Sequence, residues 1–295
     1  MILLTGASGL VGQAVLTRLV AETTPVRCLV RDPRRLGALR VRVQIALGDL
    51  ADPRSFRNAM RGVDTVIHLA ATIRDQPQGS IEELDAIATW RMVDAARRAE
   101  VERFVFFSAL GASTQSRSRL LRAKALSERA IGEAPIPSIV FAPSIIYAPG
   151  DPFLSLLGRL AMIPGVMPIM GRGDAAFQPI YVEDVADCVL AALHQPRGPS
   201  SERYELAGPQ TLDYAEIVEL VLASLGKRRA LVRIPTPLVL RSLDLLERVA
   251  RTRAFATPDE AELMEVPLLS SAGTRDAQRL GVSPRTMAQV LGVAR

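Results

Sequence analysis

A glycine-rich turn between a short apolar run and a helical pattern constrains the fold more than any other feature of this sequence. Residues 5–12 read TGASGLVG and directly follow an apolar run. In such a turn Gly6 permits a sharp change of direction, Gly9 lets the backbone approach a pyrophosphate, and Gly12 allows a helix to pack closely on a strand. The helix that begins at Leu10 would present free amide donors and a partial positive charge to a phosphate. The segment predicts the first strand, loop and helix of a dinucleotide-binding unit.

Apolar runs and helical patterns alternate through the first half of the chain. Strands are predicted at residues 1–4, 26–30, 41–46, 65–70, 103–107 and 138–141. Helices are predicted at residues 10–22, 53–61, 82–99 and 117–131. The run VIHLA at residues 66–70 is nearly all apolar, as in strands that are buried on both faces. The alternation predicts an α/β protein with the doubly wound parallel sheet of the Rossmann fold.

The regular alternation of apolar runs and helical patterns stops after Pro143, where prolines and glycines separate shorter apolar segments. A strand-like stretch at 179–182 and a helical one at 184–193 resume the first pattern. Helices follow near 214–225 and 237–253, and a tail ends at 283–290. We predict a Rossmann domain at residues 1–145, to which 178–196 return, and a smaller, interleaved C-terminal lobe at 146–177 and 197–295. A substrate or partner cleft would lie between them.

Composition excludes several classes of protein. With 295 residues, 48% of them apolar and 23% charged, the chain suits a globular protein and not a disordered or fibrous one. The net charge of +5 suits an anionic ligand as well as nucleic acid or an acidic membrane, so the charge does not distinguish among these partners.

The sequence also bears on the location of the protein. Two cysteines, Cys28 and Cys188, are too few for a disulfide framework, and the first strand leaves no room for a signal peptide, so we expect a cytoplasmic protein. Arg159, Pro164 and Pro168 interrupt the best apolar stretch, which predicts no transmembrane helix.

Arginines follow the second predicted strand, where dinucleotide-binding folds distinguish their cofactors. An acidic residue at this place favours the ribose hydroxyls of NAD, and a basic one favours the 2′-phosphate of NADP. Arg31 stands nineteen residues after Gly12, with Arg34 and Arg35 close behind, and a guanidinium matches phosphate oxygens well. We predict NADP as the cofactor. The neighbouring Asp32 keeps NAD as an alternative, and a solvated surface turn is the other reading of these arginines.

Six further segments carry a resemblance to a known family. GDL at 48–50 and HLAA at 68–71, together with the glycine loop, resemble the atypical and extended short-chain dehydrogenase/reductase superfamily, which includes epimerases and dehydratases. Four more segments resemble the branch of the nucleotide-binding accessory subunit of respiratory complex I and its bacterial relatives. These are FVFFSALGAS at 104–113, KALSE at 124–128, PSIIY at 143–147 and QPIYVEDVA at 178–186. The resemblance spans most of the chain and is thin beyond about Leu212.

The resemblance implies a set of cofactor-binding residues. Asp49 and Leu50 would border the adenine. Ala70 and Ala71 would line the cofactor, and the segment at Pro143 would pass near the nicotinamide. With the glycine loop, the predicted set is Thr5, Gly6, Ser8, Gly9, Leu10, Val11, Gly12, Arg31, Asp49, Leu50, Ala70, Ala71, Ser108, Lys124, Pro143 and Ile145.

Catalytic members of the superfamily use a tyrosine four residues before a lysine, with a serine or threonine just after the fifth strand. The phenol exchanges a proton with the substrate oxygen, while the ammonium lowers the pKa of the phenol and holds the ribose. Lys124 matches the lysine, but Leu120 stands at the tyrosine position and Ala109 at the serine position. None of the four tyrosines has a lysine four residues after it. The usual proton donors are therefore expected to be absent.

Three hydroxyl groups are conceivable substitutes for the missing tyrosine. Ser108 and Ser113 are more simply read as turn or helix-cap residues, and Tyr147 as a residue that the family carries without catalytic duty. His68 and His194 are expected to serve core packing and a helix C-terminus, respectively. No Cys/His spacing suggests a metal.

Two classes of function remain open at this point. The first is a protein that holds NADPH in a structural, assembly or redox-sensing role. The alternative is an NADP-dependent oxidoreductase or epimerase-like enzyme with a non-standard proton donor. Nucleic acid is not expected, because the arginine-rich stretch 31–42 lacks interleaved aromatics. The helix predicted at 237–253, rich in Leu and Arg, could contact a membrane surface, although such a helix more often packs on its own domain.

Overall fold

A seven-stranded sheet forms the centre of the molecule in the computed structural model, which describes residues 1–56, 58–196, 198, 200–241 and 257–293. The strand order is β3-β2-β1-β4-β5-β6-β11, and all six pairings are parallel. The order reverses between β1 and β4, as in a doubly wound sheet, so the predicted Rossmann fold is confirmed. The strands are β1 (Ile2–Thr5), β2 (Val26–Val30), β3 (Gln44–Leu47), β4 (Thr65–His68), β5 (Arg103–Phe107), β6 (Ser138–Pro143) and β11 (Glu202–Leu206).

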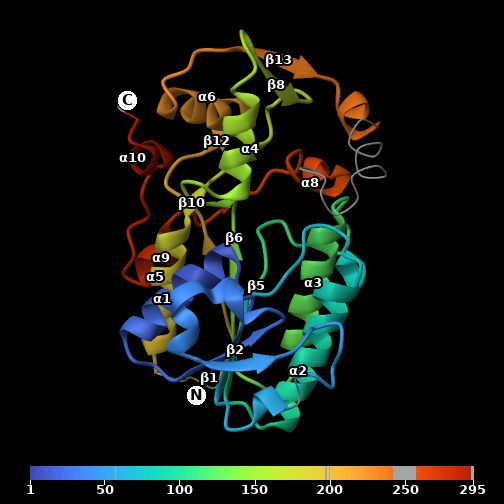
Figure 1. The fold of residues 1–295 in the computed structure, drawn as a ribbon, viewed down its shortest axis with the longest axis vertical. Helices are drawn as coiled ribbons and strands as arrows, with labels where there is room; N and C mark the ends of the chain where they lie inside the picture. Colours follow the sequence, from blue (N-terminus) through green and yellow to red (C-terminus); the bar gives the residue numbers. More distant parts are fainter. Residues whose placement is uncertain (57, 197, 199, 242–256, 294–295) are drawn as a thin grey trace.

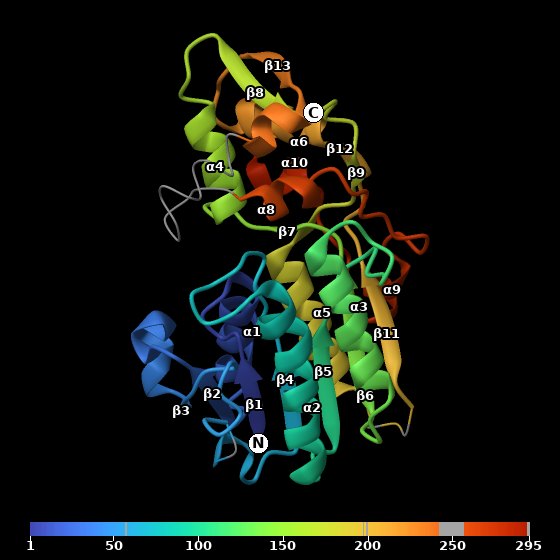
Figure 2. The ribbon, with the colours of Figure 1, turned by 90° about the vertical axis from the view of Figure 1, so that its right-hand side faces the viewer.

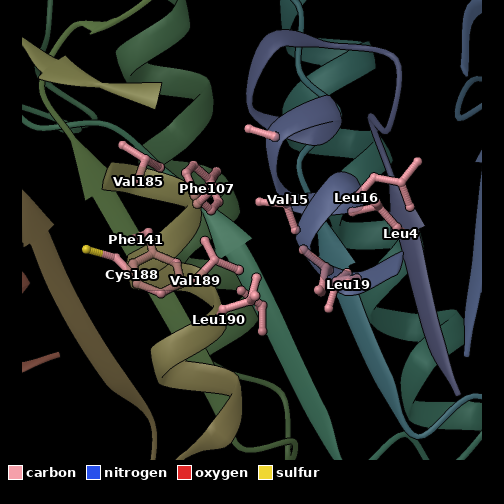
Figure 3. Close-up of a cluster of buried hydrophobic side chains, with 14 of the residues drawn as sticks. Leu4, Val15, Leu16, Leu19, Phe107, Phe141, Val185, Cys188, Val189 and Leu190 are labelled. Carbon is pink, nitrogen blue, oxygen red and sulfur yellow. The ribbon is translucent and has the colours of Figure 1, made fainter. Parts of the chain in front are cut away.

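Helices cover both faces of this sheet. One face carries α1 (Leu10–Ala21) and α5 (Val182–His194), and the other carries α2 (Ala88–Arg98) and α3 (Arg119–Gly132) (Figure 1). Successive residues of a strand point to opposite faces, so Leu4 packs in the cluster of α1 and α5 while Leu3 packs in the cluster of α2. Figure 3 shows the first cluster, in which Val15 of α1 and Val189 of α5 face the strands. Burial on both faces explains why these strands are almost wholly apolar.

A smaller lobe lies beyond the carboxyl ends of the strands, at the end of the molecule opposite the N-terminus (Figure 2). Its main elements are α4 (Pro152–Leu160), α6 (Tyr214–Ser224) and a parallel pair of strands, β8 (Val166–Met170) and β13 (Ala230–Ile234). Two shorter pairs are β7 (Ile146–Tyr147) with β10 (Ile180–Tyr181), and β9 (Ala176–Phe177) with β12 (Leu212–Asp213). Two of the last helices, α8 (Pro258–Leu263) and α10 (Met287–Leu291), also belong to this lobe, whereas α9 (Arg275–Arg279) packs on the Rossmann part beside β11. Among the described residues, no helix is long and apolar enough to cross a bilayer.

The edge strand β11 differs from the sequence analysis, which assigned residues 197–295 to the smaller lobe. Residues Glu202–Leu206 pair with Ile139–Pro143 of β6 and complete one edge of the large sheet. Tyr204 and Leu206 are buried, while Glu202 and Arg203 are exposed. An edge strand with this alternation resembles surface sequence, which is why the apolar pattern did not reveal it.

Two predicted elements of the Rossmann part also differ from the structure. The helix predicted at 53–61 is reduced to one 3-10 turn, η2 (Asn58–Met60), because the Asp52 and Ser55 side chains bond to nearby backbone groups instead. The helix predicted at 82–99 begins as a π-helix, η3 (Glu82–Ile87), before α2. A further 3-10 segment, η1 (Pro33–Val41), precedes β3 and shortens the predicted third strand. The helix predicted at 237–253 lies mostly outside the described residues, of which 237–241 are helical.

Candidate functional site

The glycine loop joins β1 to α1 and has no room for side chains. Gly6 has a φ of +72°, and a Cβ there would lie 2.6 Å from the amide nitrogen of Ala70. A Cβ on Gly12 would lie 2.1 Å from the carbonyl oxygen of Gly6. The first approach brings the loop against the segment after β4, and the second brings α1 close to the backbone that follows β1.

The start of α1 offers donors to an anion. Gly9 is the N-cap residue, no side chain caps the helix, and its first turn holds no acidic residue. The amides of the first helical turn have no acceptor within a helix, and the helix dipole places a partial positive charge there. The uncovered backbone and the missing Cβ atoms form a cradle that fits a pyrophosphate.

The predicted cofactor residues gather at one edge of the sheet. Six of the predicted residues each lie at the end of a different parallel strand or within two residues after it: Thr5, Arg31, Asp49, Ala70, Ser108 and Pro143. Backbone bonds tie these segments together, from Leu69 to Thr5 at 3.3 Å and from Leu110 to Pro143 at 2.9 Å. In open α/β sheets, ligands bind in the crevice outside the carboxyl ends of the strands. The structure therefore places the segments where a dinucleotide would lie.

Lys124 reaches this edge from α3 and is buried against Asp85. Its Nζ lies 3.2 Å from Asp85 Oδ2 and 4.9 Å from the centre of the Phe106 ring. Asp85 sits in the π-helix η3 and is fully buried. Burial raises the pKa of the Asp85 carboxyl, and the neighbouring Lys124 ammonium opposes that rise. Sequence analysis missed Asp85, which stands among other acidic residues and is distinguished from them only by its burial.

His68 is a buried member of the core at the end of β4. Its Nδ1 lies 2.7 Å from the Thr5 hydroxyl and its Nε2 lies 3.2 Å from the Thr89 hydroxyl. Burial, with the nearby Lys124 charge, lowers the pKa of His68 to about 3, so the ring is neutral. His194 ends α5 and pairs with Glu22 at 3.1 Å. Both histidines have the structural surroundings that the sequence predicts.

The three candidate proton donors have other surroundings. The Ser108 hydroxyl donates to Glu128 of α3, and the Ser113 hydroxyl accepts from the amide of Gln115 in a turn. Tyr147 is fully buried beside Tyr181, and burial raises the pKa of its phenol. Among the described residues, no hydrogen bond joins any of these three hydroxyl groups to Lys124.

Arg31 follows β2 and is exposed, as are Arg34 and Arg35. The nearby Asp32 carboxylate accepts a hydrogen bond from the Arg34 amide at 2.9 Å and thereby caps η1. This contact directs one Asp32 oxygen toward the backbone of η1.

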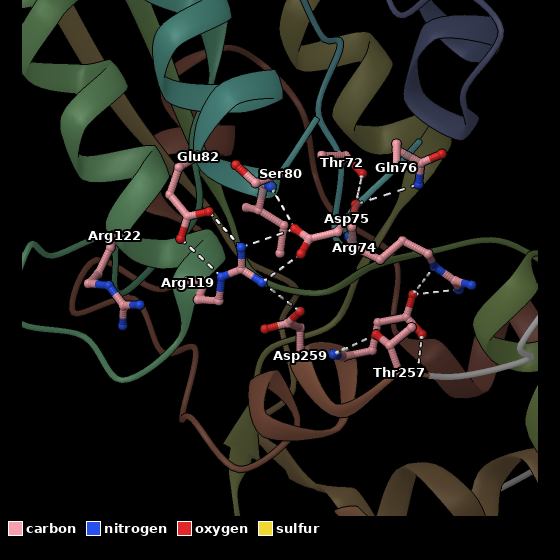
Figure 4. A network of polar contacts seen from close by, with 12 residues as sticks. Thr72, Arg74, Asp75, Gln76, Ser80, Glu82, Arg119, Arg122, Thr257 and Asp259 are labelled. Carbon is pink, nitrogen blue, oxygen red and sulfur yellow. Dashed lines mark hydrogen bonds and ion pairs between the residues drawn. The ribbon is translucent and has the colours of Figure 1, made fainter. Parts of the chain in front are cut away.

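An ion-pair network crosses from the Rossmann part to α8 (Figure 4). Arg119 binds Glu82 through two bonds of 3.0 and 2.7 Å, Asp75 at 3.0 Å, and Asp259 of α8 at 3.3 Å. Its hydrogen bonds to Glu82 lower the pKa of that carboxyl to about 2. Beside this Arg119 network, Arg74 binds Glu260 of α8 at 2.6 Å. No sequence pattern predicts these contacts, because their partners are up to 186 residues apart.

The fold and the glycine cradle define an NAD(P)-binding protein of the Rossmann type. A family model described as NAD(P)H-binding matches residues 6–135. The sterol demethylase protein B of Methylococcus capsulatus is 30% identical over 312 residues, which cover 96% of this chain and 93% of that protein. The chain belongs to the atypical and extended short-chain dehydrogenase/reductase superfamily.

A second relative agrees with this assignment, and a solved structure agrees with the fold. The mitochondrial NADH dehydrogenase [ubiquinone] 1 alpha subcomplex subunit 9 of Arabidopsis thaliana is 28% identical over 269 residues, or 89% of this chain. The chain spans 64% of the length of that subunit. A nucleoside-diphosphate-sugar epimerase of Staphylococcus aureus has the same fold, with a TM-score of 0.78 at 19% identity over 98% of this chain and 99% of that one.

Proposed function

We propose that this protein holds NADPH in a structural, assembly or redox-sensing role and does not turn it over by the superfamily's usual mechanism. The observation that carries the proposal is the ion pair of Lys124 with Asp85, in a chain that has Leu120 where catalytic members of the superfamily have a tyrosine. Leucine has no proton to transfer, and the ammonium that would lower the pKa of a phenol faces a buried carboxylate at 3.2 Å. A pocket can be retained without turnover, because ligand at a hundred times its Kd adds about 2.7 kcal/mol to folding stability.

The chain's own residues account for the binding of the cofactor. The cradle at Gly9 and the start of α1 would hold the pyrophosphate, and Arg31 would bind the 2′-phosphate. Lys124 would donate to the ribose hydroxyls with the donors that Asp85 leaves free. The nicotinamide would supply hydride chemistry if an acceptor reached it. The role of the Arabidopsis relative as a complex I subunit supports a protein partner, and the two free cysteines fit a cytoplasmic setting.

A titration of nicotinamide fluorescence tests the cofactor assignment. We expect the protein to bind NADPH about ten- to a hundredfold more tightly than NADH, the usual effect of charge-assisted hydrogen bonds. Arg31→Ala should remove this preference, whereas Arg40→Ala, at an exposed position in η1, should keep it. Equal affinities would exclude NADP selectivity, and the absence of binding by either cofactor would contradict the proposal.

Asp85 favours a second candidate function, an oxidoreductase with a carboxyl group as proton donor. Its raised pKa lets it hold a proton more readily than an exposed aspartate. The name of the Methylococcus relative points to a sterol-like acceptor for this candidate. Steady NADPH oxidation with a quinone, a ketone or a sterol ketone would displace the first proposal, and its loss in an Asp85→Asn variant that still folds and binds NADPH would support this candidate.

A further inference from the structure

The far end of the smaller lobe exposes an apolar loop. Residues 162–166, which run from the end of α4 to the first residue of β8, read MIPGV, and all five are exposed. Met162 is 67% exposed and Ile163 is 41% exposed. Runs of exposed apolar residues are unfavourable in water and are expected only where a surface has a partner.

The apolar surface continues over the outward face of the β8–β13 pair. Met167 and Ile169 point into the core of the lobe, so the alternate residues of β8 lie on the other face. On that face Val166 is 39% exposed and Val232 is 43% exposed. The outward residues, in register, are Val166 with Ala230, Pro168 with Val232, and Met170 with Ile234.

Three consecutive cations border this apolar loop. Lys227, Arg228 and Arg229 form the turn between α6 and β13. The Lys227 ammonium lies against the Met162 sulfur, and Arg229 Nε donates to the carbonyl oxygen of Ile163 at 3.0 Å. Both loops lie at the end of the molecule farthest from the N-terminus (Figures 1 and 2). We call this group the basic apolar tip: Met162, Ile163, Val166, Lys227, Arg228 and Arg229.

All charged residues of the basic apolar tip are positive. Residues 152–173 and 220–241 contain no Asp or Glu, and no described carboxylate forms an ion pair with any cation of the tip. Their single aromatic residue, Phe153, packs in the core of the lobe. Single-stranded nucleic acid would require aromatic side chains for stacking, which the tip lacks. Exposed aliphatic groups beside unpaired cations match the boundary between acyl chains and anionic headgroups.

We infer that the basic apolar tip binds the surface of an anionic lipid bilayer. The aliphatic side chains of Met162, Ile163 and Val166 would enter the headgroup boundary, and Lys227 to Arg229 would contact lipid phosphates. This orientation directs the Rossmann part away from the bilayer (Figure 2). The inference does not depend on NADPH or on turnover.

Sedimentation with lipid vesicles tests the inference. We expect the protein to bind vesicles of phosphatidylcholine that contain about a third phosphatidylglycerol, and to remain in solution with phosphatidylcholine alone. Arg228→Glu should lower the partition coefficient at least about fivefold, since each cation near such a surface contributes an effect of that size. Met162→Ser should lower it about tenfold through lost apolar burial.

Arg61→Glu is the matched control, because this exposed arginine lies in the Rossmann part and undergoes the same change of charge. It should bind vesicles as the parent does. Unchanged NADPH binding and thermal melting of each variant show that its fold is intact. The inference is overturned if the parent binds neither vesicle, if it binds both equally, or if Arg228→Glu and Arg61→Glu behave alike. Binding to an RNA probe without binding to vesicles would also overturn it.

Discussion

The Lys124 ammonium and the Asp85 carboxylate form a buried ion pair with a separation of 3.2 Å. The pair joins α3 to the π-helix η3. It offsets the charge of the one lysine that the family resemblance places at the ribose. Both the proposed function and two of the predictions below depend on this contact.

Removing one partner of the pair should destabilise the fold more than removing both. Lys124→Met leaves the Asp85 carboxylate buried without a counter-charge, which should cost about 3–5 kcal/mol in the free energy of unfolding. The double variant Lys124→Met, Asp85→Leu should recover most of that loss. Urea unfolding, followed by circular dichroism, measures the free energy of unfolding of the single and the double variant. A double variant no more stable than the single one would show that the two side chains are not energetically coupled.

The Arg119 network should hold α8 against the Rossmann part. Arg119→Gln removes its bonds to Asp75, Glu82 and Asp259, so hydrogen exchange in residues 258–263 should become faster. The loss in global stability should stay near 1 kcal/mol, because these partners are partly exposed. Arg129→Gln is the control, since the Arg129 side chain is 75% exposed and its ion pair among the described residues is a local one with Glu133, the C-cap of α3. Unchanged exchange in α8 of Arg119→Gln would count against the network.

The sequence predicted the parallel sheet and the glycine loop because both have local signals. Buried strands are nearly all apolar, and the positions of Gly9 and Gly12 reflect their close approach to the backbone of Gly6 in the same loop. The pair of Lys124 with Asp85 and the bond from Arg119 to Asp259 join residues that are far apart in the chain. Only the fold brings such partners together, so no spacing rule could have found them. The edge strand β11 was missed for a different reason, since only two of its five residues are buried and two are exposed.

Glycine substitutions should separate folding from cofactor binding. A Cβ on Gly12 would meet the Gly6 oxygen at 2.1 Å, so Gly12→Ala should lower stability and abolish NADPH binding. A Cβ on Gly9 would lie 3.3 Å from the same atom, so Gly9→Ala should fold and lose mainly the pyrophosphate contact. Gly132→Ala, which meets nothing within 4 Å at the end of α3, should bind NADPH normally and gain about 0.5 kcal/mol. Thermal melting with and without NADPH distinguishes the three. Normal binding by Gly9→Ala would contradict the assigned role of the loop.

Neutral His68 should make the protein less stable in mild acid. The unfolded chain takes up a proton on this histidine near pH 6.5, whereas the folded chain, with a pKa of about 3, does not. The unfolded state therefore binds more protons in that window, and stability should fall as the pH drops below 6.5, by up to about 1.4 kcal/mol per pH unit. His68→Asn should reduce this slope between about pH 6.5 and 5, above the ordinary pKa range of exposed carboxylates. His194→Asn, at an exposed site, should retain it; equal slopes for the parent and His68→Asn would refute the prediction.

A tyrosine introduced four residues before Lys124 should report whether the lysine charge is available for catalysis. In Leu120→Tyr the new phenol should titrate near its ordinary pKa of about 10, because Asp85 offsets the ammonium. Adding Asp85→Asn should lower that pKa by about one unit or more, since an uncompensated cation favours the phenolate. The difference in ultraviolet absorbance between each variant and its parent follows the titration. Burial raises the pKa of Tyr204 and Tyr214 to about 12, so these native tyrosines do not obscure it. A depressed pKa in Leu120→Tyr alone would mean that Lys124 can act on a phenol while paired, and the proposal of a cofactor-holding protein without turnover would lose its main support.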